Sequence, residues 1–423
     1  MTSELPNSCE VVVVGGGIVG VSTACFLARK GIPVVLCEKG RIAGEQSSRN
    51  WGFIRKQGRH PAEIPLMVRA LELWHELVPE MDEDIGFHVR GTLYLSETEK
   101  RYAANQAWME HAKAFELDTR MLSRHELQEL VPEIQNQQRG ALYTPSDARA
   151  EPEAATRAIA RIAEKHGATF LESCAVRGVD IEAGRVAGVV TEKGRIRCSA
   201  VVLAGGVWSS YFCRHLDLRL PQLKVISSVM ATEPTSFSLE QNLWSSGLGL
   251  RKRLDGGFNV AYGGNSDLEI TPDFLRYFAK FLPAYRQSKE VVNLKPGTRF
   301  FKELAWPSKW SFDQVTPFEK ERTLDPPPNE KLLDKAYLLL GQNFPNLKGI
   351  GISHKWAGMI DVTPDELPVI DTVDSIPGLT ISTGYSGHGF GIGPGAGWAT
   401  AQICTGDTPD ISLDALSLQR LRM

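Results

Sequence analysis

The first forty residues combine two continuous apolar runs with one amphipathic stretch between them. EVVVV (10–14) and IPVVLCE (32–38) are rich in β-branched residues, which is typical of strands buried on both faces of a parallel sheet. VSTACFLARKG (21–31) has apolar residues at helical spacing and ends at a glycine. The pattern therefore predicts a strand, a helix and a second strand of an α/β domain.

The turn between the first strand and the helix contains Gly15, Gly17 and Gly20 in GxGxxG spacing, and the second strand ends at Glu38. Gly15 allows the tight turn, Gly17 lets a pyrophosphate approach the helix N-terminus, and Gly20 lets the helix pack closely on the strand. Glu38 is placed to accept hydrogen bonds from ribose hydroxyls and disfavours the 2′-phosphate of NADP. The pattern predicts dinucleotide binding and leaves NAD and FAD open.

Beyond residue 60 the pattern changes repeatedly between helical and strand-like stretches. Residues 61–80 and much of 97–130 have helical spacing, whereas 222–263 is rich in strand-like runs. AVVLAGG (200–206) resembles the opening VVVVGGG and predicts a later parallel strand of the same sheet. The chain is therefore expected to leave the nucleotide-binding domain and to re-enter it at least twice.

Two glycine-rich or polar segments add to this picture. KGRIAGEQSSRNWGFIRKQGR (39–59) has hydroxyls and cations suited to a second phosphate contact, with apolar Trp51 and Phe53 interleaved; the alternative is an ordinary surface loop. In SGHGFGIGPGAG (386–397) almost every second residue is glycine, which predicts a loop whose backbone passes close to a bound group.

Composition excludes several classes of protein. Hydrophobic residues make up 42% and charged residues 23% of the 423 residues, as in an ordinary globular protein of two or three domains. The net charge of −3 provides no general attraction to nucleic acid. Seven cysteines without a CxxC pair argue against a zinc site or a disulfide framework. Without a signal-peptide pattern or an apolar run of about 18 residues, the chain is expected to be cytoplasmic.

Several motifs together resemble the D-amino-acid-oxidase superfamily of flavoproteins, which includes glycine oxidase, sarcosine oxidase and D-amino-acid dehydrogenase. They are GGGIVGVS, EKGRIAGEQSSR, VVLAGG, TPDELPVID and SGHGFGIGPGAG. A closer likeness, to bacterial L-amino-acid deaminases, runs through CAVRGV, VVTEKG, LRKRLDGG and PSKWSFDQVTPFE.

The resemblance implies FAD and a two-lobed α/β (α+β) fold. A Rossmann-like FAD-binding domain, formed by residues 1–60, 145–220 and 346–423, would be interrupted by a substrate-binding domain. That second domain, residues 61–144 and 221–345, would contain a large and mainly antiparallel sheet.

The resemblance also implies a set of cofactor contacts from three separate parts of the chain. They are Gly15, Gly17, Ile18, Val19, Gly20, Glu38, Lys39, Ser47, Ser48, Arg49, Asn50, Trp51, Val176, Ala204, Gly205, Gly206, Trp208, Gly387, His388, Gly389, Phe390, Gly391 and Ile392. Relatives that attach the flavin covalently use a cysteine where Gly358 stands or a histidine where Asn50 stands. We therefore expect FAD to be bound non-covalently.

The family reaction moves a hydride from the carbon that carries an amine to the flavin, and the resulting imine is hydrolysed to an oxo acid and ammonia. Expected catalytic residues are Arg251, His388, Trp51 and Asn50. Glycine-oxidase-like relatives have a carboxylate-binding arginine where Ile360 stands. L-amino-acid deaminases lack that arginine and use one on the sheet of the substrate domain, and the resemblance implies that Arg251 in LRKRLDGGF is the matching anchor. The alternatives are an exposed strand position for Arg251 and a solvent-facing loop for His388.

The substrate and partners are less narrowly defined by the sequence. An inward-pointing Asp361 would suit a polyamine or N-methyl amine without a carboxylate. A nicotinamide dehydrogenase and a flavoprotein subunit of a larger dehydrogenase are further alternatives. Residues 274–310 interleave basic and aromatic residues, which suits a peripheral contact with an anionic membrane or a helical subdomain over the pocket. The electron acceptor is oxygen or a quinone, and the oligomeric state is open.

Overall fold

The computed structural model describes residues 4–135, 138–288 and 292–421. Its nucleotide-binding half is built on a six-stranded sheet in the order β21-β22-β13-β1-β2-β9. The strands are β1 (Val11–Val14), β2 (Val34–Cys37), β9 (Thr169–Leu171), β13 (Ala200–Leu203), β21 (Val369–Thr372) and β22 (Leu379–Thr383). All neighbours are parallel except β21 and β22. The expected return of AVVLAGG to the sheet is therefore confirmed.

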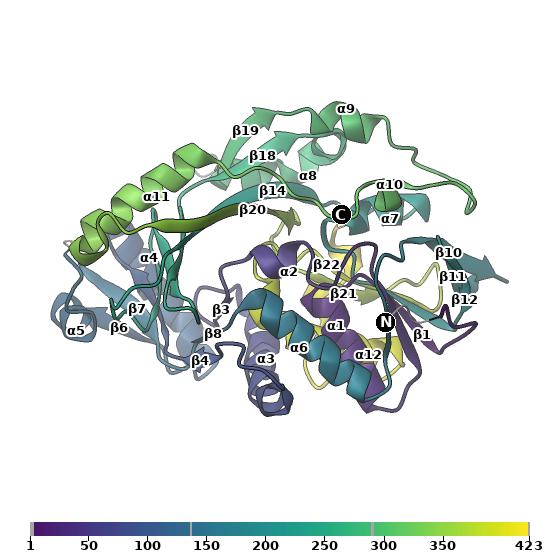
Figure 1. Cartoon of the computed structure of the whole chain (residues 1–423), viewed down its shortest axis with the longest axis horizontal. Coiled ribbons are helices and arrows are strands. Elements are labelled where there is room, and N and C mark those ends of the chain that lie inside the picture. The colour runs from purple at the N-terminus through teal and green to yellow at the C-terminus, as the bar shows by residue number, and fades with distance from the viewer. Residues whose placement is uncertain (1–3, 136–137, 289–291, 422–423) are drawn as a thin grey trace.

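Alternate residues of these strands face two different cores, which explains their continuous apolar runs. Val11 and Val13 pack with helices α1 (Ile18–Arg29), α3 (Ile64–Leu77), α6 (Pro152–Lys165) and α12 (Gly389–Cys404). Val12 packs on the other face with a small antiparallel sheet of β10 (Val176–Glu182), β11 (Arg185–Thr191) and β12 (Gly194–Arg197). Figure 1 shows the helical layer and the small sheet around this half.

The glycine-rich segment near the C-terminus is mostly helical, which corrects the expectation of a loop. It forms the first half of α12, and its glycines make close packing possible. A Cβ on Gly393 would lie 2.5 Å from Ile18, and one on Gly397 would lie 2.4 Å from Ser22, both on α1. On another face of α12, a Cβ on Gly395 would lie 2.6 Å from a carbonyl oxygen of α3.

The other half is a large, mainly antiparallel sheet that arches over the nucleotide-binding half (Figure 1). Its strands are β5 (Thr92–Leu95), β6 (Arg120–Ser123), β7 (Gly140–Thr144), β14 (Leu223–Thr232), β15 (Asn242–Trp244), β16 (Gly249–Lys252), β17 (Phe258–Ala261), β18 (Ser266–Ile270), β19 (Val292–Pro296) and β20 (Ile352–Val362). Helices α4 (Glu99–Ala114), α5 (Arg124–Leu130) and α11 (Glu330–Asn343) pack against it. The predicted two-lobed α/β class is confirmed.

Short elements connect the two halves. They are α2 (Gln46–Arg49), β3 (Phe53–Ile54), β4 (His88–Val89), β8 (Ala148–Arg149), α7 (Ser209–His215) and α10 (Pro317–Lys320). Helix α3 falls in the expected substrate-binding range 61–144 but packs in the core that β1 and α12 share. The packing places α3 with the nucleotide-binding core, and the boundary between the two domains stays a prediction.

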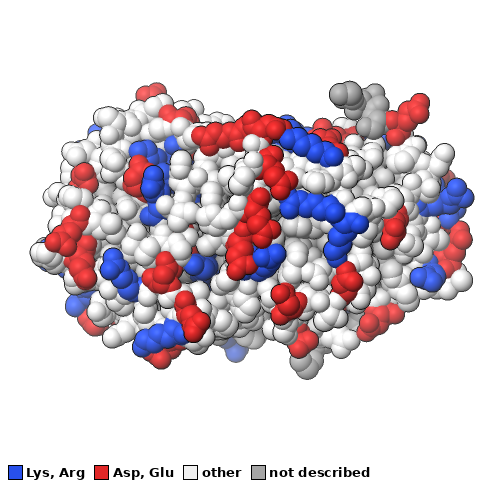
Figure 2. Space-filling model, turned by 90° about the horizontal axis from the view of Figure 1, so that it is seen from below, with Lys and Arg blue, Asp and Glu red and all other residues white. Residues whose placement is uncertain are grey.

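The segment 274–310 forms α8 (Pro272–Ser288), β19 and α9 (Arg299–Leu304), with residues 289–291 outside the described part. These helices lie at the outer edge of the large sheet (Figure 1) and expose Leu275, Phe278, Phe301 and Leu304. Within the described residues no helix is long and apolar enough to cross a membrane. The face of the molecule in Figure 2 carries acidic and basic side chains interspersed, without a broad field of one sign.

Candidate active site

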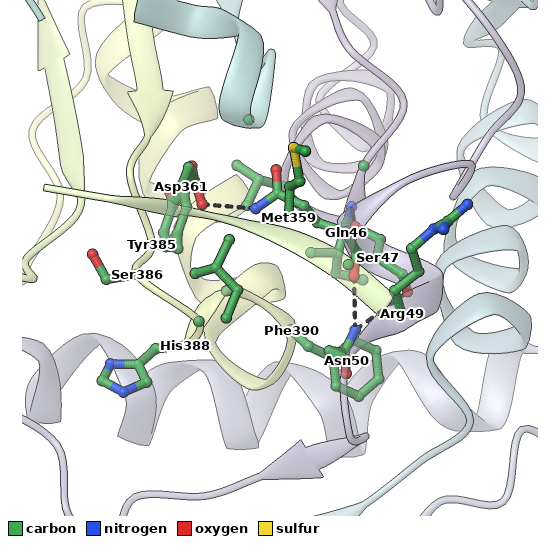
Figure 3. Close-up of a pocket in the computed structure, with 18 of the residues that line it drawn as sticks. Gln46, Ser47, Arg49, Asn50, Met359, Asp361, Tyr385, Ser386, His388 and Phe390 are labelled. Atoms are coloured by element: carbon green, nitrogen blue, oxygen red, sulfur yellow. Dashed lines mark hydrogen bonds between the residues drawn. The ribbon is translucent and has the colours of Figure 1, made fainter. Parts of the chain in front are cut away.

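One elongated cavity of about 690 Å³ runs between the two halves. The turn after β1 lines one end, together with Glu38, Val176 and Ala204. Helix α2, strand β20 and residues 385–391 line the middle, and Figure 3 shows them facing one another. Aromatic side chains of the large sheet and α4 line the remaining end. The cavity therefore joins a nucleotide-binding turn to an aromatic compartment.

Most of the cofactor residues expected from the sequence line this cavity, and three separate parts of the chain supply them. They are Gly15, Gly17, Ile18, Val19, Glu38, Lys39, Ser47, Arg49, Asn50, Trp51, Val176, Ala204, Gly205, Gly206, Trp208, Gly387, His388, Gly389, Phe390 and Gly391. Gly20, Ser48 and Ile392 do not line it. Gly20 packs on the Gly15 carbonyl, Ser48 donates to the Glu45 carbonyl, and Ile392 is buried inside α12.

At the nucleotide-binding end of the cavity, glycines leave the main chain uncovered by side chains. A Cβ on Gly15 would lie 2.4 Å from the Ala204 carbonyl oxygen, and one on Gly206 would lie 2.3 Å from Oε1 of Gln46. The Glu38 carboxylate accepts from the amides of Gly16 and Gly40, each at 2.7 Å. Close backbone, the N-terminus of α1 and a carboxylate at the end of β2 fit the pyrophosphate and ribose of a dinucleotide.

Asp361 fastens three segments together in the middle of the cavity wall. Its carboxylate accepts from Nε2 of Gln46 at 2.7 Å (Figure 3), from the Gly384 amide at 2.8 Å and from Nε2 of Gln222 at 3.2 Å. Burial raises the pKa of this carboxyl, while the donors lower it. Asp361 is therefore engaged in holding the cavity wall together, with Oδ2 accepting from Gln222, Thr383 and Gly384 and Oδ1 accepting from Gln46.

His388 belongs to a buried charged cluster beside the cavity. Its Nδ1 lies 3.4 Å from Oε2 of Glu63, and its carbonyl accepts from Nη2 of Arg59 at 3.0 Å. Arg59 also donates to Oε1 of Glu63 at 3.3 Å. Burial lowers the pKa of the His388 imidazole, while the neighbouring Glu63 carboxylate raises it. His388 is therefore a packed residue of the cavity wall and not a solvent-facing loop residue.

The structure does not bring Arg251 into the cavity, which corrects the expected anchor. The side chain is 1% exposed, and its Nη1 and Nη2 donate to the two carboxylate oxygens of Glu151 at 2.6 and 3.0 Å. Its Nε donates to the Trp51 carbonyl at 2.7 Å. Asn50 likewise bonds to backbone, accepting from the Gly52 amide and donating to the Gln46 carbonyl. Arg251 and Asn50 therefore hold the loop of Trp51 in place.

Sequence reasoning missed the residues of the aromatic compartment. Arg55 follows β3 directly, and a Cβ on Gly391 would lie 3.4 Å from its amide nitrogen. Its guanidinium carbon lies 5.6 Å from the ring centre of Tyr94, and its Nη1 donates to the Gln57 carbonyl. Within the described residues, Nε and Nη2 of Arg55 have no hydrogen-bond partner and no carboxylate pairs with it. Arg55 belongs to the cation-rich segment 39–59 that the sequence pattern singled out. Its place in the cavity could not be predicted, because it depends on contacts with Tyr94 and Gly391, which are distant in the sequence.

The fold and cavity define a protein that binds a dinucleotide between a Rossmann-like sheet and a large antiparallel sheet. The chain belongs to the DAO family of FAD dependent oxidoreductases, whose family model matches residues 10–403. The predicted family and cofactor are thereby confirmed, and the nicotinamide alternative is excluded.

Among solved structures, the chain is similar to L-amino acid deaminase from Proteus myxofaciens in complex with anthranilate. The two are 32% identical with a TM-score of 0.95, over 100% of this chain and 95% of that one. L-amino acid deaminase from Proteus vulgaris is 29% identical with a TM-score of 0.94, over 99% of each chain. The expected likeness to L-amino-acid deaminases is therefore confirmed.

Curated relatives include a sarcosine dehydrogenase and a subunit of a sarcosine oxidase. The chain is 23% identical to mitochondrial sarcosine dehydrogenase of Mus musculus over 99% of its own length, but it spans only 42% of that relative. It is 25% identical to sarcosine oxidase subunit beta of Arthrobacter sp, over 99% of this chain and 92% of the relative.

Proposed function

We propose that this protein oxidises an amino acid at the carbon that bears the amine, and releases an imine that water converts to an oxo acid and ammonia. The observation that carries the proposal is the Arg55 side chain at the cavity, whose guanidinium lies on the ring of Tyr94 and has Nε and Nη2 without a hydrogen-bond partner within the described residues. A planar guanidinium binds a carboxylate through two parallel hydrogen bonds. The overall likeness to L-amino acid deaminases supports the same class of substrate.

Each part of the cavity has a role in this reaction. Bound FAD supplies the acceptor for the hydride that leaves the substrate. Arg55 holds the substrate carboxylate, and the rings of Tyr94, Trp108 and Trp244 exclude water around the reacting carbon. The N-terminus of α12 lies at the cavity wall, where its positive end favours negative charge. Because Gly358 and Asn50 offer no nucleophile, FAD binds non-covalently in this proposal.

The test uses the purified holoprotein. We expect a yellow protein that releases its flavin into the supernatant on acid precipitation and whose flavin absorbance bleaches anaerobically with amino acids but not with polyamines. Arg55→Gln removes the bidentate grip and is expected to lower kcat/KM by about 10- to 100-fold, mainly through KM. The measurement is stopped-flow flavin reduction over a panel of L-, D- and N-methyl amino acids.

Arg139→Gln is the matched control, because Arg139 pairs with Glu99 at the surface and does not line the cavity. It should leave flavin reduction unchanged. Bleaching by polyamines alone, or an unchanged KM in Arg55→Gln, would contradict the proposal. Hydrogen peroxide formed in air would identify oxygen as the acceptor, whereas turnover only with a quinone would identify a dehydrogenase.

The likeness to sarcosine oxidase subunit beta favours a second candidate function, that of a catalytic subunit in a larger assembly. In that case the same flavin would be reduced by a secondary amine such as an N-methyl amino acid. The panel above separates the candidates, since a primary amino acid reduces the flavin in one and an N-methyl amino acid in the other.

We further propose that α8 and α9 seat the protein on a membrane surface. Phe301 is 72% exposed and Leu304 62% exposed, on a helix that packs beside α8. Exposed apolar side chains at the edge of a domain gain free energy by entering the lipid interface. Sedimentation with anionic vesicles should fall several-fold in the double variant Phe301→Ser, Leu304→Ser. Leu338→Ser on α11, where Leu338 is 65% exposed, is the control and should sediment like the wild type.

A further inference from the structure

The charges that line the cavity are mostly neutralised within the protein. Lys39 pairs with Glu45 at 2.6 Å, Arg49 pairs with Asp325, and Arg59 pairs with Glu63. Glu38 and Asp361 are bound by amide donors, as described above. Among the described residues this leaves two guanidinium groups at the cavity without a carboxylate partner, those of Arg55 and Arg101.

Both guanidinium groups rest on a pair of aromatic rings. The guanidinium carbon of Arg101 lies 4.6 Å from the ring centre of Trp244, and Trp244 lies 4.8 Å from Tyr94, centre to centre. The guanidinium of Arg55 lies against the ring of Tyr94. Arginine stacked on an aromatic face keeps its in-plane donors free for an anion. The two rings therefore form an apolar wall against which two cationic groups lie.

Arg101 is held in position by the helix that carries it. Arg101, Ala104, Asn105 and Trp108 line the cavity at the spacing of one helical face of α4. Asn105 donates to the Tyr94 carbonyl at 3.1 Å and to Oγ of Ser96 at 3.0 Å, and Trp108 donates to the Arg59 carbonyl at 3.1 Å. These bonds fix α4 against the sheet, and the small side chain of Ala104 leaves room beside Arg101.

We propose that the substrate is an amino acid with a second carboxylate on its side chain. Arg55 takes the carboxylate next to the reacting carbon, Arg101 takes the side-chain carboxylate, and the methylene carbons lie on the wall of Tyr94 and Trp244. Two stacked arginines without carboxylate partners in one cavity favour a ligand that carries two anionic groups. No acidic side chain within the described residues pairs with either of them. This inference rests on the proposed amino acid oxidation and names its substrate class.

The experiment compares acids with their uncharged amides on the holoprotein. Flavin reduction by glutamate and aspartate should show a kcat/KM at least about 10-fold above that by glutamine and asparagine, in the enantiomer that reacts. Arg101→Gln should bring the acid-to-amide ratio close to one, and Arg101→Lys should restore part of it. Lys100→Gln removes the same charge from the next residue of α4, which is exposed, and should leave the ratio unchanged.

The outcomes separate this inference from the proposed function. Reduction by leucine or phenylalanine but not by glutamate or aspartate would overturn the inference and leave amino acid oxidation standing. Equal loss for acid and amide in Arg101→Gln, with a strong salt dependence for both, would show general electrostatic steering and would also overturn it. If no amino acid of any side chain reduces the flavin, the proposed function itself is wrong.

Discussion

Gly397→Ala is expected to destabilise the protein by about 1–3 kcal/mol, although alanine is the better helix former. A Cβ at this position would lie 2.4 Å from Cβ of Ser22 and 2.6 Å from the amide nitrogen of Thr23. Both contacts involve atoms close to the main chain, so α1 and α12 have to move apart. The first turns of both helices line the cavity, and their separation should also lower FAD occupancy.

The measurements are thermal unfolding and the ratio of flavin to protein absorbance after purification. Gly341→Ala in α11 is the matched control, because a Cβ there would meet its nearest neighbour, Lys348, at 3.4 Å. That substitution should be neutral or stabilise the protein by up to about 1 kcal/mol. A Gly397→Ala protein with wild-type unfolding temperature and full flavin would show that the two helices do not depend on this close approach.

Glu63→Gln is expected to lower the free energy of unfolding by about 3–5 kcal/mol at pH 7, because it leaves a buried arginine without its counter-charge. The side chains of Arg59 and Glu63 are 2% and 1% exposed. Burial opposes ionisation of Glu63, but His388 and Arg59 overcome it and lower its pKa to about 2. The pair of Arg59 and Glu63 therefore stabilises the folded state at every pH at which Glu63 is ionised in the unfolded chain as well.

The stability that Glu63 contributes is expected to depend on pH, because its pKa is lower in the folded state than in the unfolded chain. A carboxyl whose pKa is depressed on folding contributes stability above its ordinary pKa of 4.5 and loses it as the pH falls toward 2. The difference between wild type and Glu63→Gln should therefore narrow below about pH 4.5 in denaturant titrations. Glu72→Gln, which removes an exposed partner of Arg69, should cost less than about 1 kcal/mol. A similarly small effect for Glu63→Gln would contradict the assignment.

The nucleotide end could be predicted because its signals are local. Gly15, Gly17 and Glu38 lie within one strand-turn-helix-strand unit, and the geometry of that unit determines what each residue does. The glycine-rich segment was harder to interpret, since glycine normally weakens helices. Its helical state comes from tertiary packing against α1 and α3, where a larger side chain than glycine does not fit.

The substrate anchor depends on contacts between distant parts of the chain. Alternation in β16 buries Leu250 with α11 and turns Arg251 to the opposite side, as an anchor would require. Glu151, 100 residues earlier, reaches that side and pairs with Arg251. Arg55 has no carboxylate partner because the tertiary packing brings no acidic side chain of the described residues next to it. Neither the pairing of Arg251 nor the lack of a partner for Arg55 can be predicted from spacing or composition.

The bonds that converge on Asp361 constrain the order in which the cavity is completed during folding. Its donors come from Gln46, Gln222 and Gly384, so no continuous part of the chain contains the whole arrangement. Gly384 and α12 follow every strand of the large sheet in the order of the chain. The two strands β1 and β2 can form early, but the wall around the cofactor closes only once the segment with Gly384 has joined the segments with Gln46 and Gln222. A fragment that lacks any one of these three segments therefore lacks a complete FAD site.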